Sequence, residues 1–315
     1  MFVEKSKLID SGTYGCIVTP PIENNIIKII KKYKNKNKDD VGKIFKVDLD
    51  DKKEALKEYK TFIDSSTNIK YYKDIVPEIK GYNIISSIDS KKINDCLNTN
   101  VFHKKEIHQL IYRNAGISFY DLPYNFMTYK QFIKAFNLFS KKFKYYIEYG
   151  KIHNDINEKN IMIHNNTILL IDFGLEQNKK KIFKKQNLKF FKYKYFYYPP
   201  EFRYLYLYYK KSKLSLKKKV DFMYENYNFV SKYFSLDVLS KQYIEEEIEN
   251  LIENFNLDYK KIDIFSLGIN LLSIRDKINF ASNDELKRFN NLIKKMIEPN
   301  PLKRFSIKEV IKYAK

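Results

Sequence analysis

The first third of the chain carries short apolar runs separated by polar residues, a pattern that predicts β-strands. One run spans residues 7–18 around two glycines, another spans residues 41–47, and a third spans residues 107–112. Between residues 50 and 64 the apolar positions recur three and four apart, which predicts a helix. Residues 22–40 are rich in lysine and asparagine and predict a long polar loop. The N-terminal part is therefore expected to be β-rich.

The rest of the chain shows mainly helical spacing. From residue 129 to residue 149 aromatic residues recur at helical intervals, and Gly150 stands where a helix end favours a left-handed residue. Two short apolar runs, residues 160–163 and 168–171, predict a hairpin. Residues 235–255 predict an acidic amphipathic helix whose apolar stripe either caps the C-terminal part or docks a partner. The whole pattern predicts an α+β protein.

Length and cysteine content narrow the class of protein. The 315 residues, 44% of them hydrophobic, are enough for two lobes with their own cores. No apolar run approaches the roughly 20 residues of a membrane span, and the first residues lack the apolar stretch of a signal peptide. The only cysteines are Cys16 and Cys96, which makes a disulfide framework unexpected. We therefore expect an intracellular protein that is not secreted.

The formal net charge of +21 raises the question of a polyanionic partner. Nucleic acid and an anionic membrane surface are the obvious candidates. However, only five of the 59 basic residues are arginine, there is no tryptophan, and the abundant Lys, Ile, Asn, Tyr and Phe all have AT-rich codons. Lysine drift in an AT-biased genome is therefore favoured over a dedicated polyanion site. No aromatic-basic nucleic-acid motif stands out from this background.

Acidic and amide side chains gather around the predicted hairpin. Asp155 precedes the first strand, Asn160 follows five residues later, and Asp172 ends the second strand. Hard oxygen ligands of this kind suit Mg²⁺ when substrate phosphates complete its coordination. Asp172 would be the main carboxylate ligand, Asn160 would add a neutral oxygen, and Asp155 would orient an acceptor hydroxyl. The alternative is that all three are ordinary turn residues.

Five segments resemble the protein kinase superfamily and occur in that family's order. Residues 153–160 resemble the catalytic loop H-x-D-x-x-x-x-N, and residues 172–174 resemble the metal-binding D-F-G. Residues 10–18 resemble the glycine-rich loop, with an aspartate in place of the first glycine. Residues 198–201 resemble A-P-E, and residues 263–268 resemble D-x-W-S-x-G. The style of these motifs is most similar to serine/threonine protein kinases encoded by large DNA viruses.

The resemblance implies a bilobal kinase-like fold. A small β-rich N-lobe would span residues 1–113, and a larger, mainly helical C-lobe would span residues 114–315 with an insertion at about 202–260. Asp263 would cap the backbone of the catalytic loop, and Arg304 would form a buried pair with Glu201. A viral origin would place the protein in the host cytoplasm or in the virion.

The resemblance also implies a nucleotide site. A lysine on the strand at 41–47 would hold the α- and β-phosphates and pair with a glutamate of the next helix; Lys43 with Glu58 is preferred over Lys46 with Glu54, and small Gly42 would leave space beside the adenine. Ile9 and Ile17 would cover the adenine. The implied catalytic residues are Asp155, Lys43, Glu58 and Asn160; the implied nucleotide contacts are Ile9, Gly12, Thr13, Gly15, Ile17, Lys43 and Asp172; the implied metal ligands are Asn160 and Asp172.

The expected activity is transfer of the γ-phosphate of ATP to Ser/Thr hydroxyls of proteins, with Mg²⁺, or alternatively Mn²⁺. Asn157 stands where such kinases usually carry a lysine, and Lys159 is the candidate substitute, so Tyr or dual specificity stays open. Residues 175–198 hold eight lysines and no Ser or Thr, which predicts acidic substrates and no dependence on Ser/Thr phosphorylation there. The rivals are a pseudokinase or scaffold on the same fold, a small-molecule phosphotransferase and a nucleic-acid-binding protein.

Overall fold

The computed structural model describes residues 7–12, 15–23, 26–34, 36–45, 51–85, 107–180, 182, 195–209, 213–234, 239–254 and 257–315. The chain divides into two compact units, Met1–Ala115 and Gly116–Lys315, so the division lies two residues from the predicted boundary. The expected mixed architecture is confirmed, with an antiparallel sheet in the first unit and helices predominating in the second. In the described ranges no helix has the length and apolar character needed to cross a membrane.

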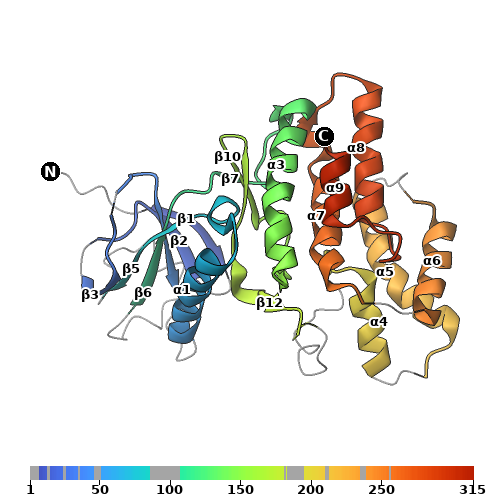
Figure 1. The fold of residues 1–315 in the computed structure, drawn as a ribbon, viewed down its shortest axis with the longest axis horizontal. Helices are drawn as coiled ribbons and strands as arrows, with labels where there is room; N and C mark the ends of the chain where they lie inside the picture. The colour runs from blue at the N-terminus through green and yellow to red at the C-terminus, as the bar shows by residue number, and fades with distance from the viewer. Residues whose placement is uncertain are drawn as a thin grey trace. The chain divides into compact units, whose positions relative to one another are not determined.

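The N-terminal unit is built on a six-stranded antiparallel sheet with the strand order β1-β2-β4-β6-β5-β3 (Figure 1). The strands are β1 Lys7–Gly12, β2 Gly15–Thr19, β3 Ile26–Lys31, β4 Val41–Phe45, β5 Ile79–Ile85 and β6 Ile107–Tyr112. Helix α1, Asp51–Asn68, packs against β4 and β6, and the 3₁₀ turn Tyr72–Asp74 follows it. The predicted helix at 50–64 is therefore present and runs one turn further.

The segment 22–40 is not the polar loop that its composition predicts. It contains strand β3, which pairs antiparallel with β5 at the edge of the sheet. Buried and exposed side chains do not alternate regularly along β3, because the successive residues Ile29 and Ile30 are 56% and 40% exposed. The prediction failed because lysines and asparagines flank the four isoleucines of Ile26–Lys31 and mask them as a strand signal.

Buried and partly buried polar contacts hold this segment to the sheet and to itself. The side chain of Gln109 accepts a hydrogen bond from the Ile22 backbone N–H and donates one to its carbonyl, both at 2.8 Å. Asp40 is 1% exposed and pairs with the Lys80 ammonium at 2.8 Å, and it also accepts a bond from the Tyr33 hydroxyl at 2.9 Å. The described residues of this segment are thus tied to the N-terminal unit by these contacts.

Cys16 lies fully buried on β2 and is disulfide-bonded. The low cysteine content made a disulfide framework unexpected, and the disulfide at Cys16 contradicts that expectation. Cys96 lies outside the described residues.

The C-terminal unit is mainly helical. Its helices are α3 Tyr129–Glu148, α4 Pro200–Tyr209, α5 Leu216–Phe234, α6 Lys241–Glu253, α7 Ile262–Ser273, α8 Asn283–Met296 and α9 Ile307–Tyr313. Its short strands are β7 Ile117–Ser118, β8 Met127–Thr128, β9 Lys151–Ile152, β10 Ile161–His164, β11 Thr167–Leu170, β12 Gln177–Asn178 and β13 Ile278–Asn279. The predicted hairpin is confirmed, because β10 and β11 pair antiparallel. Ile161 lies opposite Leu170 at one end of the pairing, and His164 lies opposite Thr167 at the other.

Helix α3 is the central core helix that its aromatic spacing predicts. Its N-terminus has a capping box, in which the Thr128 hydroxyl accepts a bond from the backbone of Gln131, whose side chain bonds back. Successive aromatic rings stack along its buried side, with Phe139 and Phe143 having ring centroids 5.2 Å apart. The helix ends at Glu148, and Gly150, two residues later, has φ 91°, the left-handed conformation expected after a helix end.

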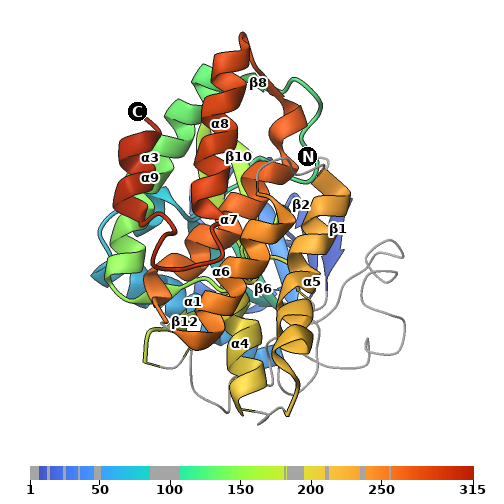
Figure 2. The same ribbon diagram turned by 90° about the vertical axis from the view of Figure 1, so that its right-hand side faces the viewer.

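Helix α6 begins later than predicted. Ser240 caps it by accepting the Tyr243 backbone N–H at 3.1 Å, whereas residues 235–238 and 255–256 lie outside the described residues. Its apolar residues Ile244 and Ile248 are buried within the C-terminal unit, where α6 packs against α4 and α5 (Figure 2). The sequence left open whether the apolar stripe of this helix caps the C-terminal part or docks a partner. The burial of Ile244 and Ile248 favours the first.

Candidate catalytic site

The loop of residues 153–160 connects β9 to β10 and is held from beneath by one buried carboxylate. Asp263, in the first turn of α7, accepts the backbone N–H of His153 at 2.8 Å and of Asn154 at 3.2 Å. Asn154 has φ 63°, a left-handed conformation that asparagine tolerates well. Burial raises the pKa of Asp263 to about 7, and the two N–H donors act in the opposite direction. The predicted capping of the loop by Asp263 is confirmed.

His153 links this loop to the end of β11. Its Nδ1 accepts the Asp155 backbone N–H at 3.3 Å, so Nε2 carries the proton and donates it to the Ile171 carbonyl at 3.0 Å. Burial lowers the pKa of His153 to about 4, so the ring is neutral near pH 7. The Phe173 ring lies 4.5 Å from the imidazole, centroid to centroid. The His153 side chain therefore connects the loop of residues 153–160 to the segment of residues 172–174 by hydrogen bonds and ring contact.

Asp155 is held by three side-chain donors. Oδ1 accepts hydrogen bonds from the Tyr195 hydroxyl at 2.9 Å and from Asn157 Nδ2 at 3.2 Å. Oδ2 accepts a bond from Asn160 Nδ2 at 3.1 Å, and the same amide nitrogen reaches the Asp155 carbonyl at 2.9 Å. Burial raises the pKa of Asp155, the three donors oppose that rise, and the negative charge of Asp172 adds to it. The carboxylate is thus fixed in one orientation.

Asp172 follows the β10–β11 hairpin in an unusual backbone conformation. Its φ of 61° and ψ of 74° are left-handed, which aspartate tolerates better than most residues. A single 3₁₀ turn, Phe173–Leu175, then leads to β12, which pairs with β9. Because the charge of Asp172 acts on both His153 and Asp155, the three groups form one electrostatic cluster.

The donor set fits a hard divalent cation only in part. Among the residues that the structure describes, no group of three or more His, Cys, Asp or Glu could hold a metal ion. Asp172 offers a carboxylate and Asn160 an amide oxygen, the ligand types that Mg²⁺ accepts. Mg²⁺ usually takes one or two protein ligands and completes its shell with water and phosphate oxygens. These two residues therefore suit a phosphate-bound Mg²⁺ better than an ion held by protein alone.

The second group of candidate residues lies in the N-terminal unit. Lys43 on β4 pairs with Glu58 on α1, with Nζ 2.8 Å from Oε2 and 3.1 Å from Oε1, and each side chain is 14% exposed. The Tyr112 hydroxyl also donates to Glu58 Oε1. The preferred pairing of Lys43 with Glu58 is confirmed. Glu54 is instead in a surface pair with a neighbouring lysine of α1, and Lys46 lies outside the described residues.

Gly42 is small for a different reason than expected. Side chains alternate along a strand, so Gly42 lies on the face of β4 opposite Lys43. A Cβ at Gly42 would lie 2.5 Å from Gln109 Oε1 and 3.3 Å from Val18. The glycine therefore makes room for the Gln109 amide. The prediction that it leaves space beside an adenine is wrong.

The remaining predicted nucleotide contacts belong to the β1–β2 hairpin. Ile17 is half-buried on β2 and is the registered partner of Lys43, so the two share one face of the sheet. Gly12 and Gly15 pair across the hairpin, and Ile9 is at the irregularity in the register of β1. Thr13 and the side chain of Ile9 lie outside the described residues.

Two side chains around Asp155 have roles that the sequence did not indicate. Asn157 orients Asp155 and also accepts the Lys159 backbone N–H at 3.0 Å. The Lys159 ammonium lies 5.0 Å from the ring centre of Tyr120, on the exposed side of the loop. Tyr195 was one tyrosine among many in a lysine- and tyrosine-rich segment, and no spacing rule singled it out. Only the path of the folded chain brings it to Asp155.

A buried ion pair anchors the start of α4. Arg304 NH1 lies 2.7 Å from Glu201 Oε1 and its NH2 lies 2.9 Å from Oε2, a bidentate geometry. The two side chains are 0% and 2% exposed. The predicted buried pair is confirmed.

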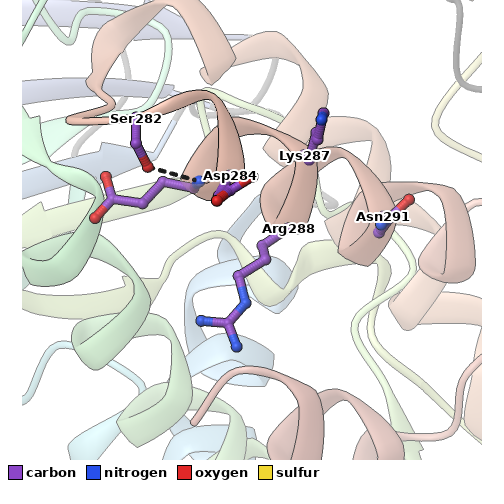
Figure 3. A pocket seen from close by; sticks show the side chains of 6 residues that line it. Ser282, Asp284, Lys287, Arg288 and Asn291 are labelled. Atoms are coloured by element: carbon purple, nitrogen blue, oxygen red, sulfur yellow. Dashed lines mark hydrogen bonds between the residues drawn. The ribbon is translucent and has the colours of Figure 1, made fainter.

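A separate hollow lies along α8. Its lining consists of polar residues, namely Ser282, Asp284, Glu285, Lys287, Arg288 and Asn291. Figure 3 shows Lys287 and Arg288 pointing in different directions, so the charges do not converge. None of the candidate catalytic residues lines this hollow.

No protein-family model matches this chain, and no curated protein matches it either.

Proposed function

We propose that the protein is a bilobal protein kinase that transfers the γ-phosphate of ATP to Ser/Thr hydroxyls of proteins. The observation that carries this proposal is the Asp155 carboxylate, which Asn157 and Asn160 orient, on a loop whose His153 is hydrogen-bonded to the carbonyl of Ile171, the neighbour of Asp172. A positioned carboxylate beside a metal-binding aspartate is the arrangement that phosphoryl transfer needs. A pair of turn residues would not need a third residue, Asp263, buried beneath the loop.

Each residue has a defined task in this proposal. Asp155 accepts a hydrogen bond from the acceptor hydroxyl and takes its proton as the new phosphate ester forms. Asn160 and Asp172 would hold Mg²⁺, or Mn²⁺ in its place, which neutralises phosphate charge when bound. Lys43, oriented by Glu58, would bind the α- and β-phosphates of ATP. The motifs of this chain are most similar in style to those of serine/threonine kinases encoded by large DNA viruses.

Two features favour a protein substrate over a small molecule. The Glu201–Arg304 pair and the Asp263 cap are built into the helical unit in the positions that the protein-kinase resemblance implies. The Glu201–Arg304 pair anchors the end of the segment of residues 195–201, next to Asp155, where a peptide acceptor would bind. This segment begins with the Tyr195–Asp155 contact.

The test is transfer of label from γ-labelled ATP to casein in the presence of Mg²⁺. We expect transfer by the wild type and by Asp276→Asn, a control carboxylate that is 76% exposed, and none by Asp172→Asn. Binding of ATP without transfer by the wild type would favour a pseudokinase. Equal transfer by wild type and Asp172→Asn would disprove the assignment.

A further inference from the structure

Strand β3 forms one edge of the N-terminal sheet. In the part of the chain that the structure describes, it pairs with β5 on one side and with no strand on the other (Figure 1). The outward N–H and C=O groups of an edge strand can pair with a further strand. Single exposed apolar side chains are common, but here two in succession, Ile29 and Ile30, lie beside such an edge. Backbone groups and apolar contacts together are what an added strand needs.

The edge is already in place before any partner binds. The Lys31 ammonium donates to the Ile79 carbonyl at the start of β5, and the Gln109 amide holds both backbone groups of Ile22. The pairing with β5 shifts between Ile29 and Lys31, and such an irregularity interrupts the alternation of side chains. This shift explains why neighbouring isoleucines both reach solvent. A preformed strand loses little conformational entropy when a partner pairs with it.

The charge along this edge has one sign. Residues 24–38 contain six lysines and no Asp or Glu, and Lys28, Lys32 and Lys34 are exposed. Lysines on an edge strand oppose its pairing with a second copy, because like charges would face each other across the two strands. A strand that carries carboxylates would instead bring opposite charges together. The edge therefore disfavours a copy of itself and suits an acidic strand.

We propose that the outer edge of β3 binds an extended acidic segment of a partner protein, which adds to the sheet as a further strand. Asp or Glu residues of that segment contact the lysines, and β-branched residues between them contact Ile29 and Ile30. Strands β5 and β6 lie between β3 and β4, so the added strand does not pair with the strand that carries Lys43. The inference is independent of the proposed kinase function.

The experiment uses the full-length protein and a fluorescein-labelled peptide in which Glu and Val alternate, with binding followed by anisotropy. A second peptide of the same sequence carries methyl groups on two adjacent central backbone nitrogens. Methylation removes a hydrogen-bond donor from each edge of the peptide but keeps every charge and side chain. We expect the first peptide to bind and the methylated peptide to bind about tenfold more weakly, because backbone bonds are lost.

Amide hydrogen exchange locates the bound peptide. Exchange of residues 26–31 should slow when the unmethylated peptide binds. Residues 7–12 form β1, the opposite edge of the same sheet, and their exchange should not change.

Variants of β3 separate the apolar contacts from the charge. Ile29→Thr combined with Ile30→Thr keeps β-branched side chains in the strand and should weaken binding about tenfold. Ile117→Thr, the same change at an exposed isoleucine of β7, is the matched control and should bind as the wild type does. Lys28→Glu combined with Lys32→Glu should reverse the preference, so that a peptide of alternating Lys and Val binds better than the Glu–Val peptide. Urea unfolding that matches the wild type shows that each variant is folded.

Four outcomes would overturn the inference. Equal binding of the methylated peptide would mean that the lysines only adsorb negative charge. Slower exchange at residues 7–12 instead of 26–31 would place the peptide on the wrong edge. Exchange at residues 26–31 that slows as the concentration of the protein alone rises would make a second copy the occupant. Absence of binding to the wild type would show that this edge does not accept an acidic strand.

Discussion

At the scale of single residues, the Lys43–Glu58 pair gives the most direct mutational prediction. Lys43→Met should lower phosphoryl transfer by about 100-fold or more, because a preorganised charge on the phosphates is lost. Lys60→Met, which changes an exposed lysine of α1, is the matched control and should leave the rate unchanged. The rate of casein labelling checks both. Similar rates for Lys43→Met and wild type would mean that the pair is only structural.

Asp263 gives a prediction about stability and pH. Its folded pKa of about 7 lies above the ordinary value of 3.8, so between these pH values the folded state binds a proton that the unfolded state has released. The contribution of Asp263 to stability therefore falls as pH rises from about 4 to 7 and is constant above. Asparagine does not titrate in this range, so the stability deficit of Asp263→Asn should shrink over that interval.

Urea unfolding of wild type and Asp263→Asn at a series of pH values measures this deficit. A deficit that grows with pH would show that the two backbone N–H bonds outweigh the burial of the charge. The urea unfolding curves of an exposed variant, Asp276→Asn, provide the control for general effects of pH.

Much of the candidate site could be predicted at this scale through the resemblance to a known family. Lys43, Glu58 and Asp263 were found because they stand at the positions that the family's motifs imply. Tyr195 could not be found, because its contact with Asp155 depends on how forty residues of chain return to the loop. Gly42 was misread, since its neighbour Gln109 comes from a strand distant in sequence.

At the scale of elements, the segment 22–40 shows what composition conceals. The Gln109 side-chain amide on β6 is fully buried and forms hydrogen bonds with both backbone groups of Ile22. Gln109→Leu would leave the Ile22 N–H and carbonyl buried without these partners, at a cost of about 2 kcal/mol or more in the free energy of unfolding. Gln242→Ala on the surface of α6 is the control and should change stability little. Urea unfolding measures both, and equal stability of wild type and Gln109→Leu would mean that water replaces the amide.

The helices were predicted better than this segment because their signal is local. Apolar spacing located α3 and α6 to within a few residues, and each begins at a side-chain cap, Thr128 or Ser240. The position of β3 depends instead on a pairing partner, β5, about fifty residues away. Edge strands of this kind carry little periodicity of their own, so tertiary pairing decides them.

At the scale of the whole molecule, the division of the chain followed from the order of the motifs. A strand-rich part before residue 113 and a helical part after it correspond to the two units, Met1–Ala115 and Gly116–Lys315. The buried pair of Glu201 and Arg304 could be predicted only through the resemblance, because 103 residues separate its members.

The net charge of +21 is a property of the whole chain and predicts how substrates are selected. Lys179 and Lys180 are exposed and open the lysine-rich segment that follows Asp172. A peptide acceptor flanked by Asp and Glu should therefore have a higher kcat/KM than the same acceptor flanked by neutral residues, because the positive field steers it to the site. Raising the salt concentration should reduce this preference, since mobile ions screen exposed charges.

The neutral peptide corrects for any effect of salt on ATP binding. A preference for Lys- or Arg-flanked peptides, or a preference for acidic peptides that salt does not change, would show that the lysines only keep the surface solvated.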